Sequence, residues 1–149
     1  IMDTQIFIPM SYLFILTFLV FLFSSTLRYK EIYINKFLGK PTVNGEEHRH
    51  PPFTEGSKYL KNAQRNLVNL FEFPMLFYVV CILIFVTNNV DLHYIQLAYS
   101  YACLRVLHSL YHIFFNHLIF NGGYPVRSFI WFPSTMILGW MWLRFAFSL

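Results

Sequence analysis

Residues 6–27, IFIPMSYLFILTFLVFLFSSTL, decide the fold class, because this stretch contains no charged side chain. As a helix its 22 residues cover about 33 Å, slightly more than the roughly 30 Å hydrocarbon core of a bilayer. The whole chain has the same character, since 56% of its 149 residues are hydrophobic, 21% aromatic and only 12% charged. That balance is typical of a membrane protein. A signal peptide would have preceding basic residues and a shorter apolar region, so we predict a retained membrane helix.

Three more apolar segments follow, and each is long enough to form a helix. We therefore predict an all-α integral membrane protein whose single domain, residues 1–149, is a four-transmembrane-helix bundle. The predicted helices cover about residues 5–28, 60–87, 92–120 and 127–148. One long polar loop, about residues 29–59, joins the first two helices, and its prolines and glycines disfavour a helix through its middle.

Basic residues are distributed unevenly between the connections. The first connection and its borders carry seven of them, whereas the second, TNNVDLH, carries none: Arg28, Lys30, Lys36, Lys40, Arg49, Lys58 and Lys61. The positive-inside rule then predicts that the first loop faces the cytoplasm and that both termini face away. Glutamates interrupt the basic residues, so they form no stripe that would indicate nucleic-acid binding.

Three polar residues, Arg65, Asn69 and Glu72, occur where the second apolar segment begins. At 100° per residue they fall within about 60° of one another, and they descend about 10 Å along the helix. An ionised Glu72 at that depth costs several kcal/mol unless a partner is present. Pro74 follows and is expected to bend the helix near this stripe.

The third predicted helix offers a partner on one face, formed by Arg105, His108 and His112. We expect Arg105 to pair with Glu72 between packed helices. The simpler alternative is a buried pair that only fixes helix register, while the other arginines reach lipid head groups. The two histidines have the i, i+4 spacing of metal ligands but lack a suitable third ligand, so we predict no metal site.

The chain resembles the MAPEG family, the membrane-associated proteins in eicosanoid and glutathione metabolism, along nearly its whole length. Members typically carry an arginine, an asparagine four residues later and a glutamate three residues after that, which Arg65, Asn69 and Glu72 match. The segments LFEFPMLFY and LRVLHSLYH look like an uncharacterised bacterial branch. The resemblance therefore implies a multi-pass protein of a bacterial inner membrane, in contact with lipid.

The resemblance further implies a homotrimer with glutathione sites between neighbouring subunits, open to the cytoplasm. Arg127 is the candidate catalytic residue, since one arginine near the start of the fourth helix stabilises the thiolate in the best understood branches. The implied glutathione-binding residues are Arg28, Arg65, Asn69, Glu72, Arg105, His108 and His112. The last two histidines stand where the synthase branch has tyrosines.

Glutathione carries two carboxylates, an ammonium and a thiol, so a basic pocket with one acidic group complements it. We expect arginines to bind the carboxylates, Glu72 to bind the ammonium, and a cation near sulfur to favour the nucleophilic thiolate. This chemistry suits a transferase or peroxidase acting on lipophilic electrophiles. The alternative is a non-catalytic binding or scaffold protein of the same fold. A transporter is disfavoured because the chain has no inverted repeat.

Overall fold

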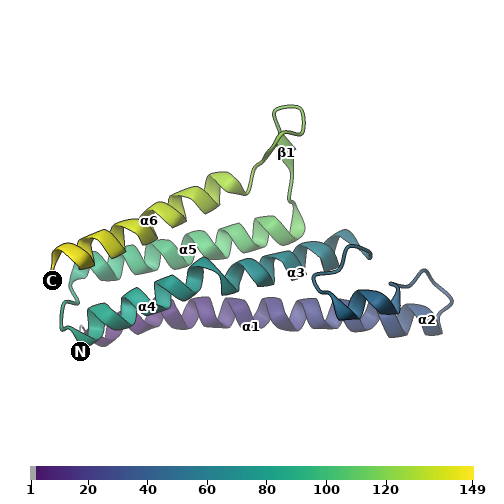
Figure 1. Cartoon of the computed structure of the whole chain (residues 1–149), viewed down its shortest axis with the longest axis horizontal. Helices are drawn as coiled ribbons and strands as arrows, with labels where there is room; N and C mark the ends of the chain where they lie inside the picture. Colours follow the sequence, from purple (N-terminus) through teal and green to yellow (C-terminus); the bar gives the residue numbers. More distant parts are fainter. Residues whose placement is uncertain (1–2) are drawn as a thin grey trace.

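The computed structural model describes residues 3–149 and is dominated by long helices (Figure 1). The short helix η1 (Asp3–Ile6) leads into α1 (Phe7–Tyr29), which continues through η2 (Lys30–Ile34) and α2 (Asn35–Phe37). The helical segment is therefore 35 residues long. The prediction that the loop begins at residue 29 was wrong, because Glu31 and Ile32 are buried against later residues and keep the backbone helical.

The loop between α2 and α3 is folded. It contains the short helix η3 (Gly45–Arg49) and a small apolar cluster in which Phe53 and Val43 pack with Ile32 and Leu60. The backbone N–H of Phe53 donates to Oε1 of Gln64. The loop is therefore held against the end of α1 and the start of α3.

The second predicted helix is two helices, α3 (Lys58–Phe71) and α4 (Phe73–Val86). They meet at Glu72, whose φ of −88° and ψ of −100° lie outside the helical region. Pro74 sits in the first turn of α4, where its missing N–H costs no helical hydrogen bond. Instead of the expected bend near Pro74, the helix is interrupted at Glu72.

The helix α5 (Leu92–Phe114) ends six residues before the predicted end at residue 120. Asn116 has a φ of +49°, a left-handed conformation that stops the helix. The chain then forms a hairpin of β1 (Leu118–Ile119) and β2 (Tyr124–Pro125), and α6 (Ser128–Phe147) follows.

The helices pack side by side as a bundle in which α5 contacts α1, α3 and α6 (Figure 1). The loop before α3 and the β1–β2 hairpin lie at one end of the bundle (Figure 1). The start of α1, the end of α6 and the α4–α5 connection lie at the other end (Figure 1). The side of the membrane on which each end lies stays a prediction.

Two helical segments within residues 3–149 are long and apolar enough to cross a membrane. They are Asp3–Phe37, with a mean hydropathy of 2.5, and Lys58–Val86, with 2.2. Several polar side chains in the second half of α5 are buried, namely Arg105, His108, Ser109 and His112. The hydropathy of α5 is therefore reduced by residues that face the protein interior, which is where the candidate site lies.

Candidate functional site

A small cavity of about 170 Å³ opens between α3, α5 and α6, near the end of the bundle that carries the hairpin. Its lining residues come from all three helices or their first turns and combine a guanidinium, an imidazole and an indole: Asn69, His108, Arg127, Ser128 and Trp131. Three of them, Asn69, His108 and Arg127, belong to the residues selected from the sequence. The fold therefore brings part of the expected site together within one chain.

Arg105 lies fully buried beside this cavity. Its Nη2 donates to the side-chain Oδ1 of Asn69 and to the backbone carbonyl of the same residue, the latter at 3.3 Å. Its Nε and Nη1 have no hydrogen-bond partner within the described chain. These two nitrogens have hydrogen-bonding capacity that the described residues leave unused, which is unusual because buried polar groups are nearly always hydrogen-bonded.

The expected ion pair between Glu72 and Arg105 was wrong. The ion pairs among the described side chains join Arg49 to Glu46 and Arg144 to Asp91. The reason is the break at Glu72, which leaves that carboxylate exposed at the surface of the single chain. Glu72 still attracts Arg105 through space, but Asn69 provides the direct contact.

His108 and His112 lie on the buried face of α5, with ring centroids 5.7 Å apart. They are only 2% and 5% exposed, and the Nδ1 atom of each lacks a hydrogen-bond partner in the described part of the chain. Trp131, across the cavity, has an indole Nε1 in the same condition. Several polar atoms around the cavity therefore have hydrogen-bonding capacity that the described residues leave unused.

A row of asparagines on α3 contributes polar contacts that the sequence analysis missed. Asn66 accepts a hydrogen bond from the hydroxyl of Ser109 at 3.3 Å. Asn62 donates from Nδ2 to the carbonyl of Ile113 at 3.2 Å. The spacing of Asn62, Asn66 and Asn69, four residues and then three, places them on one helix face. This spacing could have predicted from the sequence that the three asparagines share one face of α3.

The remaining predicted residues lie away from the cavity lining. The guanidinium of Arg28 sits over the ring of Phe53, 4.9 Å from its centroid, and so packs against the folded loop. Arg65 is exposed, although its charge interacts with that of Arg127. Within one chain, Arg65 and Glu72 are therefore exposed at the surface, and Arg28 packs against Phe53 of the loop. The cavity and its surroundings hold Asn69, Arg105, His108, His112 and Arg127.

The charges around the cavity are unbalanced. Arg65, Arg105 and Arg127 act on this region, whereas Glu72 is the carboxylate that acts on Arg105. The excess of guanidinium groups favours an anionic ligand that also carries a cationic group. Among the side chains that the structure describes, no group of three His, Cys, Asp or Glu residues is placed to hold a metal ion.

Comparison with known proteins gives one match. A sequence model of the MAPEG family matches residues 6–147 of the 149-residue chain. No curated protein and no solved structure matches the chain.

Proposed function

Because the chain belongs to the MAPEG family of all-helical integral membrane proteins, we propose that it is a membrane glutathione transferase or peroxidase acting on lipophilic electrophiles. The observation that carries this proposal is the pair of guanidinium groups at one small cavity. Arg127 lines the cavity, and Arg105 is buried beside it with two unpartnered nitrogens. Members of the family use glutathione, whose anionic groups require such donors.

The charged groups of glutathione can be distributed over the site. Its carboxylates suit Arg65 and Arg105, because a guanidinium binds a carboxylate through two parallel hydrogen bonds. Its ammonium suits Glu72, which has no ion-pair partner within the described residues. The thiol would then lie in the cavity beside Arg127, with His108 within the same lining. In this assignment the three arginines bind the anionic groups of glutathione, and Glu72 binds its one cationic group.

Arg127 acts on the sulfur in this scheme. A guanidinium beside the thiol stabilises the thiolate, and the released proton passes to water. The sulfur lone pair then forms a bond to the electrophilic carbon of the lipophilic substrate, and the leaving group departs with the electrons of the broken bond. With a hydroperoxide the thiolate attacks the terminal oxygen and the O–O bond breaks, so that the sulfur becomes a sulfenic acid and the alkoxide takes a proton from water to leave as the alcohol. A second glutathione then displaces water from the sulfenic acid and forms the disulfide. The lipid phase supplies either substrate.

The cavity of a single chain is too small for the whole tripeptide, since typical ligand sites measure about 300–1,000 Å³ and this one measures about 170 Å³. We therefore propose that glutathione extends from the cavity toward Arg65 and Glu72 and is covered by a neighbouring copy in a homotrimer. Arg28 packs on the folded loop, away from the cavity of its own chain. In a trimer it would serve the neighbour's site.

Calorimetric titration of the detergent-purified protein with glutathione tests the ligand. The ultraviolet absorbance of the bound thiolate, followed against pH, tests the role of Arg127. We expect binding and a lowered thiol pKa in the wild type, and a raised thiol pKa with smaller loss of affinity in Arg127→Ala. Arg49→Ala is the control, because Arg49 is an exposed loop arginine paired with Glu46.

The outcomes separate the two functions considered. No heat of binding at millimolar glutathione would exclude this thiol as the ligand. Binding without thiolate formation near neutral pH would favour the alternative, a non-catalytic binding or scaffold protein with the same fold. Equal thiol pKa values for the wild type and Arg127→Ala would remove Arg127 from the catalytic role.

A further inference from the structure

The chain that connects α5 to α6 carries an asparagine in an unusual position. Asn116 follows the end of α5 with a φ of +49°, and its backbone N–H donates to the carbonyl of Tyr111 at 2.9 Å. Few residues other than glycine adopt this left-handed conformation readily, and asparagine is the main exception. Because Asn116 is not in the helical conformation, its side chain does not follow the helical arrangement of the α5 side chains.

Both ends of the Asn116 amide are engaged. Its Oδ1 accepts a hydrogen bond from Nη1 of Arg127, and its Nδ2 donates to Oδ1 of Asn62 at 3.1 Å. Asn62, only 7% exposed on α3, in turn donates to the carbonyl of Ile113 on α5. A continuous series of three hydrogen bonds therefore joins the interior of the bundle to the guanidinium at the cavity.

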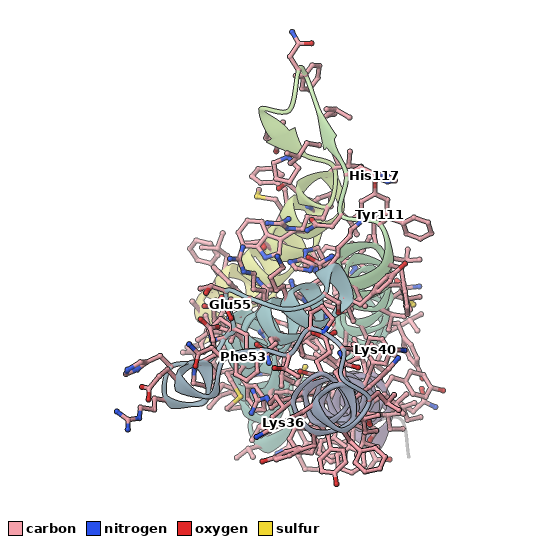
Figure 2. The ribbon with its side chains drawn as sticks, turned by 90° about the vertical axis from the view of Figure 1, so that its right-hand side faces the viewer. Lys36, Lys40, Phe53, Glu55, Tyr111 and His117 are labelled. Atoms are coloured by element: carbon pink, nitrogen blue, oxygen red, sulfur yellow. The ribbon has the colours of Figure 1, made fainter. Side chains whose placement is uncertain are left out.

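The backbone around Asn116 is fixed on both sides. The N–H of Val126 donates to the carbonyl of His117 at 3.0 Å, which closes the base of the hairpin. The hydroxyl of Tyr111 lies 3.2 Å from Nδ1 of His117, and Figure 2 shows these two side chains together where the hairpin leaves the helices. The carbonyl of Arg127 accepts from Trp131 in the first turn of α6. The backbone on both sides of Asn116 is therefore held in place by hydrogen bonds.

We propose that Asn116 and Asn62 are positioning residues that hold the guanidinium of Arg127 at the cavity. The inference rests on the proposed function in that Arg127 is the residue whose placement matters. The hydrogen bond to Asn116 uses one guanidinium nitrogen, and arginine has five N–H donors in all. A neutral acceptor also leaves the positive charge undiminished, whereas an aspartate at the same position would offset it. An amide is the suitable group because it accepts from Arg127 and donates to Asn62 at once.

Asn116→Gly is the decisive variant. Glycine adopts a positive φ without strain, so the backbone at the hairpin is retained while the amide is removed. The chain provides a matched control in Asn121, which has a φ of +57° and lies exposed near the hairpin tip. Asn121→Gly makes the same chemical change at the same type of backbone conformation, away from Arg127. Thermal unfolding of both variants in detergent checks that they remain folded.

The readout is the pKa of glutathione's thiol in the bound state, measured from thiolate absorbance against pH, together with the dissociation constant. We expect the thiol pKa in Asn116→Gly to rise by about one unit, which is about tenfold less thiolate at a fixed pH below the pKa. Affinity measured at a pH below the pKa of the bound thiol, where the thiol stays protonated, should stay within about twofold, because the carboxylate and ammonium contacts are unchanged. Asn121→Gly should match the wild type. Equal thiol pKa values in the two variants would overturn the proposal.

A second measurement tests the positioning without glutathione. Phenylglyoxal modifies accessible guanidinium groups, and peptide mass spectrometry reports the rate at Arg127 separately from the other arginines. We expect Arg127 to react several-fold faster in Asn116→Gly than in Asn121→Gly or the wild type, because a released guanidinium samples more conformations. If the wild type binds no glutathione, the proposed function fails and this rate still decides the positioning. Equal rates would contradict it.

Discussion

The carboxylate of Asp91 accepts two hydrogen bonds from the guanidinium of Arg144, one of them 2.9 Å between Oδ1 and Nη1. This pair joins the start of α5 to the end of α6, at the end of the bundle opposite the cavity. The same carboxylate caps α5 by accepting from the backbone N–H of Tyr94 at 2.8 Å. Arg144 also lies over the ring of Tyr94, 4.1 Å from its centroid. One side chain therefore serves as both helix cap and ion-pair partner.

The first prediction separates these two roles through pH. The hydrogen bond from Arg144 is the main cause that lowers the pKa of Asp91 below its usual value. A carboxyl whose pKa is lower in the folded state adds stability above its unfolded pKa of about 3.9 and loses it as pH falls through the folded value. Asp91→Asn keeps a good cap but removes the charge.

We expect Asp91→Asn to lower the free energy of unfolding at neutral pH by about 1 kcal/mol or less, since the pair is partly exposed. Below the pKa of folded Asp91 the variant and the wild type should unfold together. Thermal unfolding in detergent at a series of pH values measures this difference. A difference that is constant over the whole acid range would assign the effect to something other than the ion pair.

The second prediction concerns Arg105 and Asn69, which are in direct contact. Replacing Asn69 by leucine leaves a buried guanidinium with fewer partners, whereas replacing both residues by apolar ones removes the unpaired charge. A hydrogen bond to a charged group contributes about 1.5–3 kcal/mol, so the coupling energy of Asn69→Leu with Arg105→Met should be of that order. Thermal unfolding of the four variants gives the cycle. The matched cycle of Glu72→Gln with Arg105→Met should show weaker coupling, because Glu72 acts through space only.

The third prediction distinguishes residues that bind glutathione from the one that activates it. Arg65→Ala and Glu72→Gln should each weaken binding about tenfold, since each removes one charge-assisted contact. The pKa of the bound thiol should stay unchanged in both, because neither residue is placed at the sulfur in the proposed site. Calorimetry with the thiolate titration measures the two quantities. A raised thiol pKa in either variant would show that the tripeptide is oriented differently.

The fourth prediction is topological. Lys40→Cys, in the loop before α3, should be protected from a membrane-impermeant maleimide in intact cells, whereas Asn89→Cys, in the α4–α5 connection, should be labelled. Both are made in a Cys103→Ala background, because Cys103 is exposed on the outer surface of α5 and Cys81 is buried. Labelling of Lys40→Cys from outside the cell would reverse the orientation. Permeabilised cells, in which both positions react, provide the control.

Hydropathy and spacing were sufficient to predict the helical class and the polar face of α3. Of the three residues on that face, Asn69 lines the cavity and contacts Arg105, whereas Arg65 and Glu72 are exposed away from the lining. The partner of Arg105 could not be predicted, because the choice between Asn69 and Glu72 depends on the backbone break at Glu72. A proline two residues later indicates a break near that point without fixing which residue leaves the helix.

The end of α5 could not be predicted for a similar reason. Residues 115–120 continue the apolar pattern, so periodicity favours a longer helix. The left-handed conformations of Asn116, Phe120 and Asn121 instead turn the chain into a hairpin. Phenylalanine rarely adopts a positive φ, and Phe120 does so within the turn between β1 and β2, where its side chain is exposed. The contact between Asn116 and Arg127 exists only because of that turn.

The long helical segment that begins at Asp3 is longer than the hydrocarbon core of a bilayer, so part of it lies in lipid and part extends into water. Its 35 residues extend about 52 Å, well beyond the roughly 30 Å that lipid tails occupy. The cluster of Ile32, Val43, Phe53 and Leu60 therefore gains stability from the exclusion of water, as a soluble domain does, whereas helices within lipid associate through packing and hydrogen bonds. Urea weakens the former, so it should loosen the loop at concentrations that leave the bundle assembled. Arg28 packs on Phe53 of this loop, so unfolding of the loop in urea would also release the side chain of Arg28.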